Sequence, residues 1–547
     1  MKSKKLVSLL LAGTMVASLA ACGNSSNTST SGDGSSQSST STGTDSSSTD
    51  NSTTDSTSDS SSSAAAVDTS DRVDLVFYVM GDAPADEEAV ENAINEILLD
   101  KVNATVDFQF STWTEFQQKY SLELTSGTAD LIYIANWLNF GQLAKSGAFL
   151  ELNDLLDSVA PTLKETVGES ALNMCSVDGD IYAIPNTWAE YVSNGFKYRE
   201  DLRQKYDLPV PNSLENAEAY FLGIKENDPS QGILTVTTEE SQGLDVAFDA
   251  AWVLSFKYPW VTPKGLPYGL AADYNTPNDV YDYWFSDDFV EDAKMLKRWA
   301  DEGFWSRSAL SDTNNSDSYK MGLCVAEIAG QNPNKQITAI NDFEEAGEGW
   351  ISEYIAYGET TGIIFPGHAT QNGTSIVRGC KNPERALMVL ELFLCDEELN
   401  KLVQAGIEGT HYEIDSDGFY KNLSTDFGYE GFNTWNLRNG DYKLMQSTDV
   451  ELQKMFDKYE EIGNKTKFPN TDIYSGFTED YEAYAAERTA VSNVMRQYLA
   501  PIQAGLVDDV DAAVAEFREK VQAAGLDTCR EGFKEQWNAY CEAYGYK

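Results

Sequence analysis

The sequence predicts an α/β protein whose body is divided into two lobes. Apolar stretches that alternate in the manner of strands are separated by amphipathic helical stretches between residues 73 and 134. Strand–helix–strand order implies a parallel sheet with helices on its faces. Beyond residue 66 the chain has about 480 residues, too many for one simple core, so a second lobe is expected.

The elements of the first lobe follow in order. Residues 73–79 form the first predicted strand, because Val73, Leu75, Phe77 and Val79 alternate with other residues, and residues 81–84 break it. A helix follows, and the apolar residues on one of its faces are Val90, Ile94, Ile97 and Leu98. A second strand around residues 106–110, a helix over 115–124 and a third strand over 131–134 complete the pattern.

The ends of these strands carry the first candidate binding residues. In a parallel sheet with helices on its faces, ligands bind beyond the carboxyl ends of the strands. The aromatic and polar residues expected there are Tyr78, Asp82, Trp113, Asn136 and Trp137. Packing alone is the alternative explanation for each of them.

The first 66 residues predict export and attachment. Lys2, Lys4 and Lys5 precede an apolar run, which is typical of a signal peptide over residues 1–21. Leu19-Ala20-Ala21-Cys22 resembles the bacterial lipobox, which implies lipidation of Cys22 and anchoring on the outer face of a cell membrane, by analogy at a Gram-positive surface. Ordinary secretion is the alternative. Residues 22–66 are the lipidated cysteine and a tether rich in Ser, Thr and Asp, which is expected to be disordered.

Composition excludes several functions. A formal charge of -48 argues against nucleic acid, whose phosphates must be met by Lys and Arg, and leaves neutral ligands open. No segment after the signal peptide is apolar for long enough to cross a bilayer. The remaining cysteines are scattered, only two histidines are present, and the acidic stretch 312–317 lacks the glycine and glutamate of a calcium loop. We therefore expect buried thiols, no metal site and no cofactor.

Several motifs, in order along the chain, resemble one family. The motifs are residues 147–156 (GAFLELNDLL), 178–185 (DGDIYAIP), 381–386 (KNPERA), 406–413 (GIEGTHYE), 468–472 (FPNTD) and 523–527 (AAGLD). Their order behind a lipobox resembles extracellular solute-binding lipoproteins of carbohydrate ABC importers, in a family 1-like subgroup with a C-terminal helical extension. Asp180 and Cys380 depart from the residues common in that family.

The resemblance implies a type II fold like that of periplasmic binding proteins, with two α/β lobes, an interlobe hinge and extra C-terminal helices. We expect lobe 1 to begin with residues 67–187, lobe 2 to span 188–366, and 367–547 to hold the return to lobe 1 and the helical region. The crossings are expected near 185–190 and 365–372. The implied cycle is closure of the hinge on a ligand in the cleft, docking on a membrane permease and release, by a monomer.

An oligosaccharide is the expected ligand, because aromatic walls and a few polar groups bind pyranose rings. Residues 325–330 are expected to form a strand of lobe 2 that ends before Gln331. The further candidates, at loops or element ends, are Asn186, Trp188, Trp252, Trp284, Gln331, Asn332, Trp435 and Asn436. Trp299 and the stripe Phe533, Trp537, Tyr540 and Tyr544 have helical spacing and are expected to be core.

Three alternatives remain open. A glycoside hydrolase would need two carboxylates about 5.5 Å or about 6.5–9.5 Å apart, and no segment singles out such a pair. A receptor for a peptide or an amino acid would use an arginine to hold the ligand carboxylate, for which Arg199, Arg203 and Arg378 are candidates. A sensor that presents its ligand to a receptor would share the same binding site.

Overall fold

A computed structural model describes residues 67–112, 115–188, 190–239, 247–312 and 317–547, so the predicted signal peptide, Cys22, the predicted tether and Trp113 lie outside the described residues. The strands are β1 (Val73–Met80), β2 (Ala104–Ser111), β3 (Leu131–Ile134), β4 (Ser176–Val177), β5 (Asp180–Ile181), β6 (Ile184–Pro185), β7 (Gly195–Arg199), β8 (Gly232–Leu234), β9 (Thr238–Glu239), β10 (Ala247–Phe248), β11 (Leu270–Ala271), β12 (Tyr281–Asp282), β13 (Cys324–Glu327), β14 (Ser352–Ala356), β15 (Gly373–Ile376), β16 (Tyr412–Ile414) and β17 (Tyr420–Asn422).

The α-helices are α1 (Glu87–Val102), α2 (Phe116–Ser126), α3 (Phe140–Lys145), α4 (Asn153–Val159), α5 (Pro161–Val167), α6 (Glu169–Met174), α7 (Glu200–Lys205), α8 (Leu214–Asn227), α9 (Asp287–Asp301), α10 (Asp317–Lys320), α11 (Pro333–Ala346), α12 (Gly358–Thr361), α13 (Pro383–Cys395), α14 (Glu397–Ala405), α15 (Asp449–Gly463), α16 (Ala485–Val494), α17 (Ala500–Gln503), α18 (Val510–Ala523) and α19 (Leu526–Tyr544).

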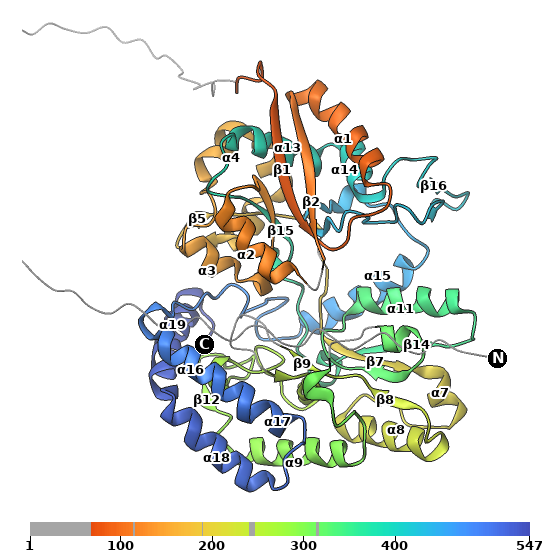
Figure 1. Ribbon diagram of the computed structural model, residues 1–547, viewed down its shortest axis with the longest axis vertical. Coiled ribbons are helices and arrows are strands. Elements are labelled where there is room, and N and C mark those ends of the chain that lie inside the picture. The colour runs from red at the N-terminus through yellow and green to blue at the C-terminus, as the bar shows by residue number, and fades with distance from the viewer. Residues whose placement is uncertain (1–66, 113–114, 189, 240–246, 313–316) are drawn as a thin grey trace, which may run out of the picture. The chain divides into compact units, whose positions relative to one another are not determined.

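The first lobe is built on a five-stranded sheet with the order β2-β1-β3-β15-β6 (Figure 1). Strands β1, β2 and β3 are parallel, as the alternation of strands and helices predicts. Strand β15 runs antiparallel to β3 and starts at the carboxyl end of β3, because Gly373 pairs with Ile134. Pro185, the last residue of β6, also pairs with Gly373. The end of β6 and the start of β15 therefore lie at the carboxyl edge of this sheet.

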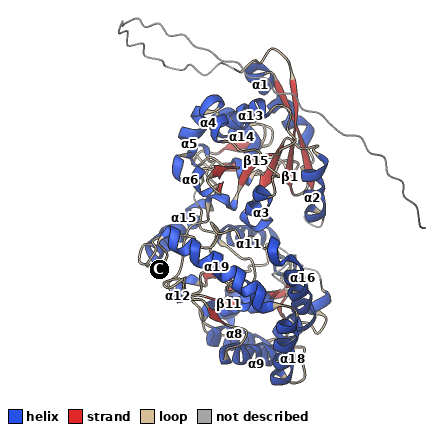
Figure 2. Cartoon of the chain, turned by 90° about the vertical axis from the view of Figure 1, so that its left-hand side faces the viewer, coloured by secondary structure: helices blue, strands red, loops and turns tan. Residues whose placement is uncertain are grey.

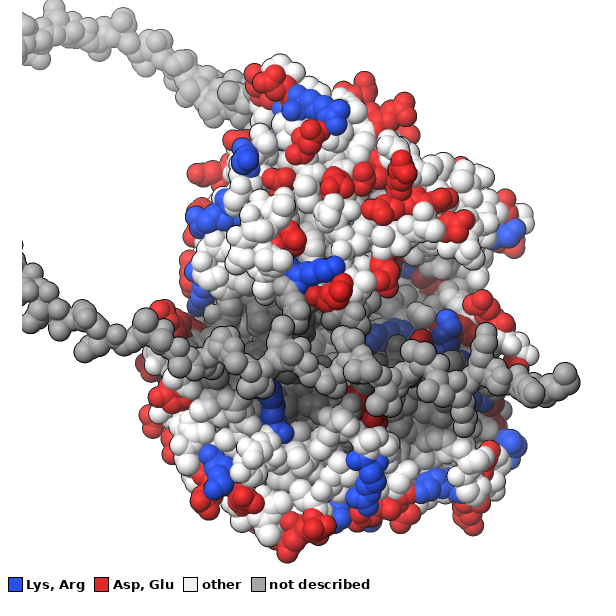
Figure 3. Space-filling view, viewed as in Figure 1, with Lys and Arg blue, Asp and Glu red and all other residues white. Residues whose placement is uncertain are grey.

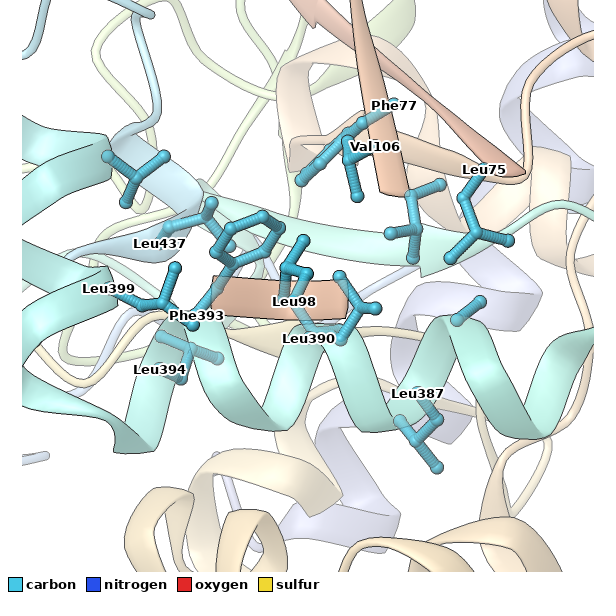
Figure 4. Packing of buried hydrophobic residues seen from close by; sticks show 14 of the residues in the cluster. Leu75, Phe77, Leu98, Val106, Leu387, Leu390, Phe393, Leu394, Leu399 and Leu437 are labelled. Carbon is cyan, nitrogen blue, oxygen red and sulfur yellow. The ribbon is translucent and has the colours of Figure 1, made fainter. Parts of the chain in front are cut away.

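Both faces of this sheet are covered by helices (Figure 2). Leu75 and Phe77 point from β1 into a cluster that includes Phe393 and other residues of α1, α13 and α14 (Figure 4). Tyr78, the residue after Phe77 in the alternation, packs on the other face with Tyr120 of α2. The two-residue period of the strand thus supplies two separate apolar layers.

The second lobe is built on a four-stranded sheet with the order β14-β7-β13-β8. Strand β7 runs antiparallel to both of its neighbours, so it begins where β13 and β14 end. The predicted strand 325–330 is shorter than expected. It starts at Cys324 and ends at Glu327, and Gly330 adopts a left-handed conformation with φ 61 that turns the chain away from the sheet.

The chain crosses between the two sheets at their carboxyl edges. It leaves the first sheet at Pro185 and enters the second at Gly195, then leaves the second at Ala356 and returns at Gly373. Both crossings therefore pass the edges at which ligands bind in sheets of this kind.

The C-terminal helices pack onto segments of the second lobe. Phe517 of α18 lies 5.1 Å from Trp284 between ring centroids, and the indole Nε1 of Trp537 in α19 donates a hydrogen bond of 2.7 Å to the carbonyl of Pro277. Phe533, Trp537 and Trp299 are buried, as their helical spacing predicts. Tyr544 at the end of the last stripe is 65% exposed, so the expectation that it is core is wrong.

Substitution of Phe393 tests how much the core of the first lobe contributes to stability. Its fully buried ring lies 6.0 Å from Phe108 and 6.4 Å from Phe77. Phe393→Ala should lower the free energy of unfolding by about 3–5 kcal/mol, because it removes buried apolar surface and leaves a cavity. Urea denaturation followed by circular dichroism measures this loss. The control Leu122→Ala, at a side chain that is 60% exposed, should change stability by less than about 0.5 kcal/mol.

Candidate ligand-binding site

Four aromatic rings lie together at the carboxyl edge of the first sheet. Tyr133 of β3 is buried, and its ring centroid lies 6.3 Å from those of Trp137 and Trp435. Phe116 packs edge-on against Trp137 at 6.1 Å. Trp137 and Trp435 are only half-buried. We call Phe116, Tyr133, Trp137 and Trp435 the aromatic surface.

Two amide side chains lie beside the aromatic surface. Asn186, just after β6, donates from Nδ2 to the carbonyl of Trp435 at 2.9 Å, and its Oδ1 has no partner among the described residues. Asn136 accepts a hydrogen bond of 2.8 Å from the backbone N–H of Trp137. Flat apolar rings beside amide groups can bind a molecule that has both apolar faces and hydroxyl groups.

The end of β1 is closed by a loop from much later in the chain. Gly81 has φ +105, and a Cβ atom at this position would lie 2.3 Å from Nδ2 of Asn433. The same amide donates to the backbone carbonyl of Asp82 at 3.4 Å, and the Asp82 side chain is exposed. Glycine is therefore required here by close approach as well as by its backbone conformation.

The charged groups near the aromatic surface are paired. Arg438 lies between Glu190 and Glu430, with contacts of 3.1 and 2.5 Å. Burial opposes the charged form of Arg438, but Glu430 and Glu190 hold its pKa above the usual value. Burial raises the pKa of Tyr133, so its hydroxyl stays protonated and can donate a hydrogen bond.

Trp188 lies against cations. Nζ of Lys443 is 3.5 Å from the centre of its ring, and the guanidinium of Arg438 is 5.6 Å away. The three side chains line a hollow of about 230 Å³, open solvent included, together with Tyr429 and Tyr442. The structure thus places Trp188 in cation–π contacts, and a ligand contact for it stays a prediction.

Trp252 and Trp284 lie in the second lobe and are almost fully buried. Nζ of Lys264 lies 5.0 Å from the ring centre of Trp252. Trp284 packs on Gly269 and Phe517 and lines a cavity of about 650 Å³, open solvent included. Their ligand roles stay predictions.

Gln331 and Asn332 follow β13 at the carboxyl edge of the second sheet. Asn332 caps α11 by accepting a hydrogen bond of 3.0 Å from the N–H of Lys335. Gln331 donates from Nε2 to the carbonyl of Ala329 at 2.8 Å, while its buried Oε1 has no hydrogen-bond partner among the described residues. Gln331 therefore retains an acceptor, whereas the Asn332 oxygen is already engaged.

Two other candidates lie inside the first lobe. Tyr78 is buried in the layer beneath α2. Asn436 is fully buried and donates from Nδ2 to the hydroxyl of Thr374 at 2.6 Å. Of the predicted residues, the structure thus groups Asn136, Trp137, Asn186 and Trp435.

The sequence did not identify Tyr133 or Phe116. Tyr133 lies in a strand that reads as a buried apolar run, and its hydroxyl near the carboxyl end was the only signal. The described residues hold no cluster of three or more His, Cys, Asp or Glu side chains suited to a metal ion. Within the same residues no helix has the length and apolar character needed to cross a membrane.

The sequence matches two known protein families. Residues 83–388, more than half of the chain, match the family described as bacterial extracellular solute-binding protein. The chain belongs to this solute-binding protein family. Residues 473–542, which include most of the C-terminal helices, match a domain of unknown function. The family resemblance predicted from the ordered motifs is therefore confirmed.

Solute-binding proteins of known sequence and structure resemble the chain over most of its length. A carbohydrate ABC transporter substrate-binding protein of Streptococcus pneumoniae is 24% identical over 474 residues, which cover 84% of this chain and 89% of the relative. The crystal structure of N-glycan transport solute binding protein (NgtS) from the same species has a TM-score of 0.67, with 20% identity and coverage of 86% and 99%. An extracellular solute-binding protein of Bifidobacterium longum subsp. infantis has a TM-score of 0.60, with 16% identity and coverage of 86% and 98%. These likenesses confirm the two-lobe fold.

The buried side chain of His368, on the return crossing, predicts a dependence of stability on pH. Its Nδ1 accepts from the N–H of Thr370 at 3.3 Å, and burial lowers its pKa below the usual 6.5 while Asp472 opposes this shift. The unfolded chain binds the proton more readily, so stability should be full above about pH 6.5 and fall as the pH drops through the lower folded pKa. Urea denaturation between pH 7.5 and 5 measures this fall. His368→Asn keeps a neutral acceptor and should flatten the curve; an unchanged curve would contradict the assignment.

Proposed function

We propose that the protein is the substrate-binding receptor of an ABC importer and captures a neutral oligosaccharide. The observation that carries the proposal is the pair Trp137 and Trp435, both half-buried and each 6.3 Å from the ring of Tyr133 at the carboxyl edge of the first sheet. Both interlobe crossings pass this edge. A ligand bound here would touch the segments on which closure of the lobes depends.

The chemistry of the surroundings suits a sugar. The C–H faces of a pyranose stack on indole rings, and its hydroxyls need hydrogen-bond partners. Asn136 and Asn186 offer amides beside the rings. The unpartnered Oε1 of Gln331 at the edge of the second sheet offers an acceptor from the other lobe.

The pairing of the arginines favours a neutral ligand over an amino acid or a peptide. Arg199 binds Asp201 at 2.7 Å, and Arg203 binds Glu200 at 2.6 Å. Arg378 follows β15 beyond the opposite edge of the first sheet and donates to the carbonyl of Gly147. On the face shown in Figure 3, acidic side chains are spread over both lobes, which disfavours polyanionic ligands as well.

The similar proteins support a carbohydrate ligand. NgtS was crystallised with Man1GlcNAc and with Man5GlcNAc, and the S. pneumoniae protein FusA, with a TM-score of 0.60, was crystallised with kestose. These proteins bind sugars, and no catalysis is part of the role that we propose here. The remaining parts of the proposal are a lipid anchor at Cys22, residues 22–66 as the tether on the extracytoplasmic face, and a membrane permease as the partner. The body is a monomer in which residues 67–187 are the first part of lobe 1, 188–366 are lobe 2, and 367–547 are the return to lobe 1 and the C-terminal helical region.

Isothermal titration of the purified protein tests the ligand class. The panel is Man1GlcNAc, Man5GlcNAc, kestose, a neutral tripeptide and free amino acids. Saturable heat with an oligosaccharide supports the proposal. Heat with only the peptide or the amino acids would overturn the ligand class, and release of monosaccharide during incubation would indicate a hydrolase.

Trp137 and Trp188 form a matched pair of variants. Trp137→Ala should weaken binding of the best oligosaccharide in the panel about 10- to 100-fold, because it removes one stacking ring, equivalent to about 1.4–2.8 kcal/mol. Trp188→Ala, the same truncation, should change affinity by less than about threefold, because Lys443 already lies against the ring of Trp188. Titration calorimetry on both variants gives the comparison. Equal losses would contradict the location that we propose for the site.

A further inference from the structure

Glu190, on the first crossing, is a buried carboxylate that contacts three other parts of the chain. Its Oε2 accepts from Nδ2 of Asn334 at 2.7 Å and from Arg438 at 3.1 Å, and its Oε1 accepts from Nδ2 of Asn372 at 3.4 Å. Asn334 is in the first turn of α11 in the second lobe, and Asn372 is on the return crossing. The Glu190 carbonyl also accepts from the N–H of Gly367, which joins the two crossings directly.

This cluster continues to the aromatic surface. The hydroxyl of Tyr133 donates to Oδ1 of Asn372 at 2.6 Å, and both side chains are buried. The ring of the same tyrosine is flanked by Trp137 and Trp435. An unbroken series of contacts therefore runs from the aromatic surface through Tyr133, Asn372 and Glu190 to Asn334.

We propose that Tyr133, Asn372 and Glu190 are positioning residues that couple occupation of the aromatic surface to the placement of the second lobe. This inference rests on the proposed binding role. The hydrogen bond of the Tyr133 hydroxyl fixes the ring that contacts both tryptophans, and the Glu190 carboxylate fixes α11. A ligand that needs both elements in place binds more tightly when the series is intact, because it does not have to order them itself.

The charges explain why the series has a defined geometry. A buried carboxylate is costly unless it is paired and hydrogen-bonded, so Glu190 favours arrangements that keep Arg438, Asn372 and Asn334 in reach. Arg438 is held on its other side by Glu430. Movement of α11 away from the crossing would remove the hydrogen bond from Asn334, and this gives the two lobes a preferred arrangement.

A double-mutant cycle between Tyr133→Phe and Asn334→Ala tests this coupling. Each change removes one end of the series, and the phenylalanine keeps the ring for stacking. With the best-binding oligosaccharide of the panel, each single variant should bind about 5- to 10-fold more weakly by calorimetry. The double variant should bind no more weakly than the weaker-binding single variant. If the two residues had independent structural roles, the two losses of affinity would multiply to about 25- to 100-fold. Tyr220→Phe, which removes a buried hydroxyl bonded to the Arg199 carbonyl, is the control and should leave affinity unchanged.

The same double-mutant cycle is also measured without ligand. A failure of the proposed sugar ligand can then be distinguished from a failure of the positioning role. Spin labels at Leu122→Cys and Leu323→Cys, both exposed, report the interlobe distance in a background with Cys22, Cys380 and Cys395 changed to Ser. Each single variant should broaden the distance distribution, and the double variant should broaden it no further. If no oligosaccharide binds, a non-additive distance cycle keeps the positioning role while the proposed ligand fails. Additive affinities, or unchanged distances in every variant, overturn the inference.

Discussion

The arrangement of this protein depends on a buried negative charge at the point where the chain passes between its two sheets. Glu190 must be met by donors wherever the second lobe lies, and its donors come from α11, from the return crossing and from Arg438. A buried ion pair of this kind contributes little net stability compared with apolar packing. What it does provide is specificity, because few arrangements of the lobes satisfy the carboxylate. The apolar clusters hold each lobe together, and this polar cluster restricts how one lobe is placed on the other.

The aromatic surface has its properties because charge is kept out of it. The guanidinium of Arg438 is near Tyr133, but it is engaged by two carboxylates and by the ring of Trp188. Half-buried indole faces next to paired charges do not attract anions, and they retain the affinity of an apolar plane for C–H groups.

The sequence predicted the first sheet well because its signals are local. Alternation in 73–79 and helical spacing around Val90 depend only on near neighbours, and β1 and α1 have the predicted positions. Asn136 and Trp137 could be predicted because they directly follow a strand. Tyr133, Asn372 and Glu190 could not, since their contacts join residues 182 or 239 positions apart. Nor does an aromatic residue in a loop reveal whether it faces a ligand or, like Trp284, a helix near the C-terminus.

The position of the crossings links binding to movement for a topological reason. Strands β6 and β15 meet at Gly373, so the chain leaves and re-enters the first sheet at the edge where its parallel strands end. The best place for a ligand on such a sheet is therefore also the place where the lobes are joined. A molecule bound there contacts the crossings directly. If its contacts differ between two arrangements of the lobes, this difference is sufficient to change the relative stability of those arrangements. A receptor that must hold a solute and then release it to a membrane partner needs this combination, and it follows from strand order alone.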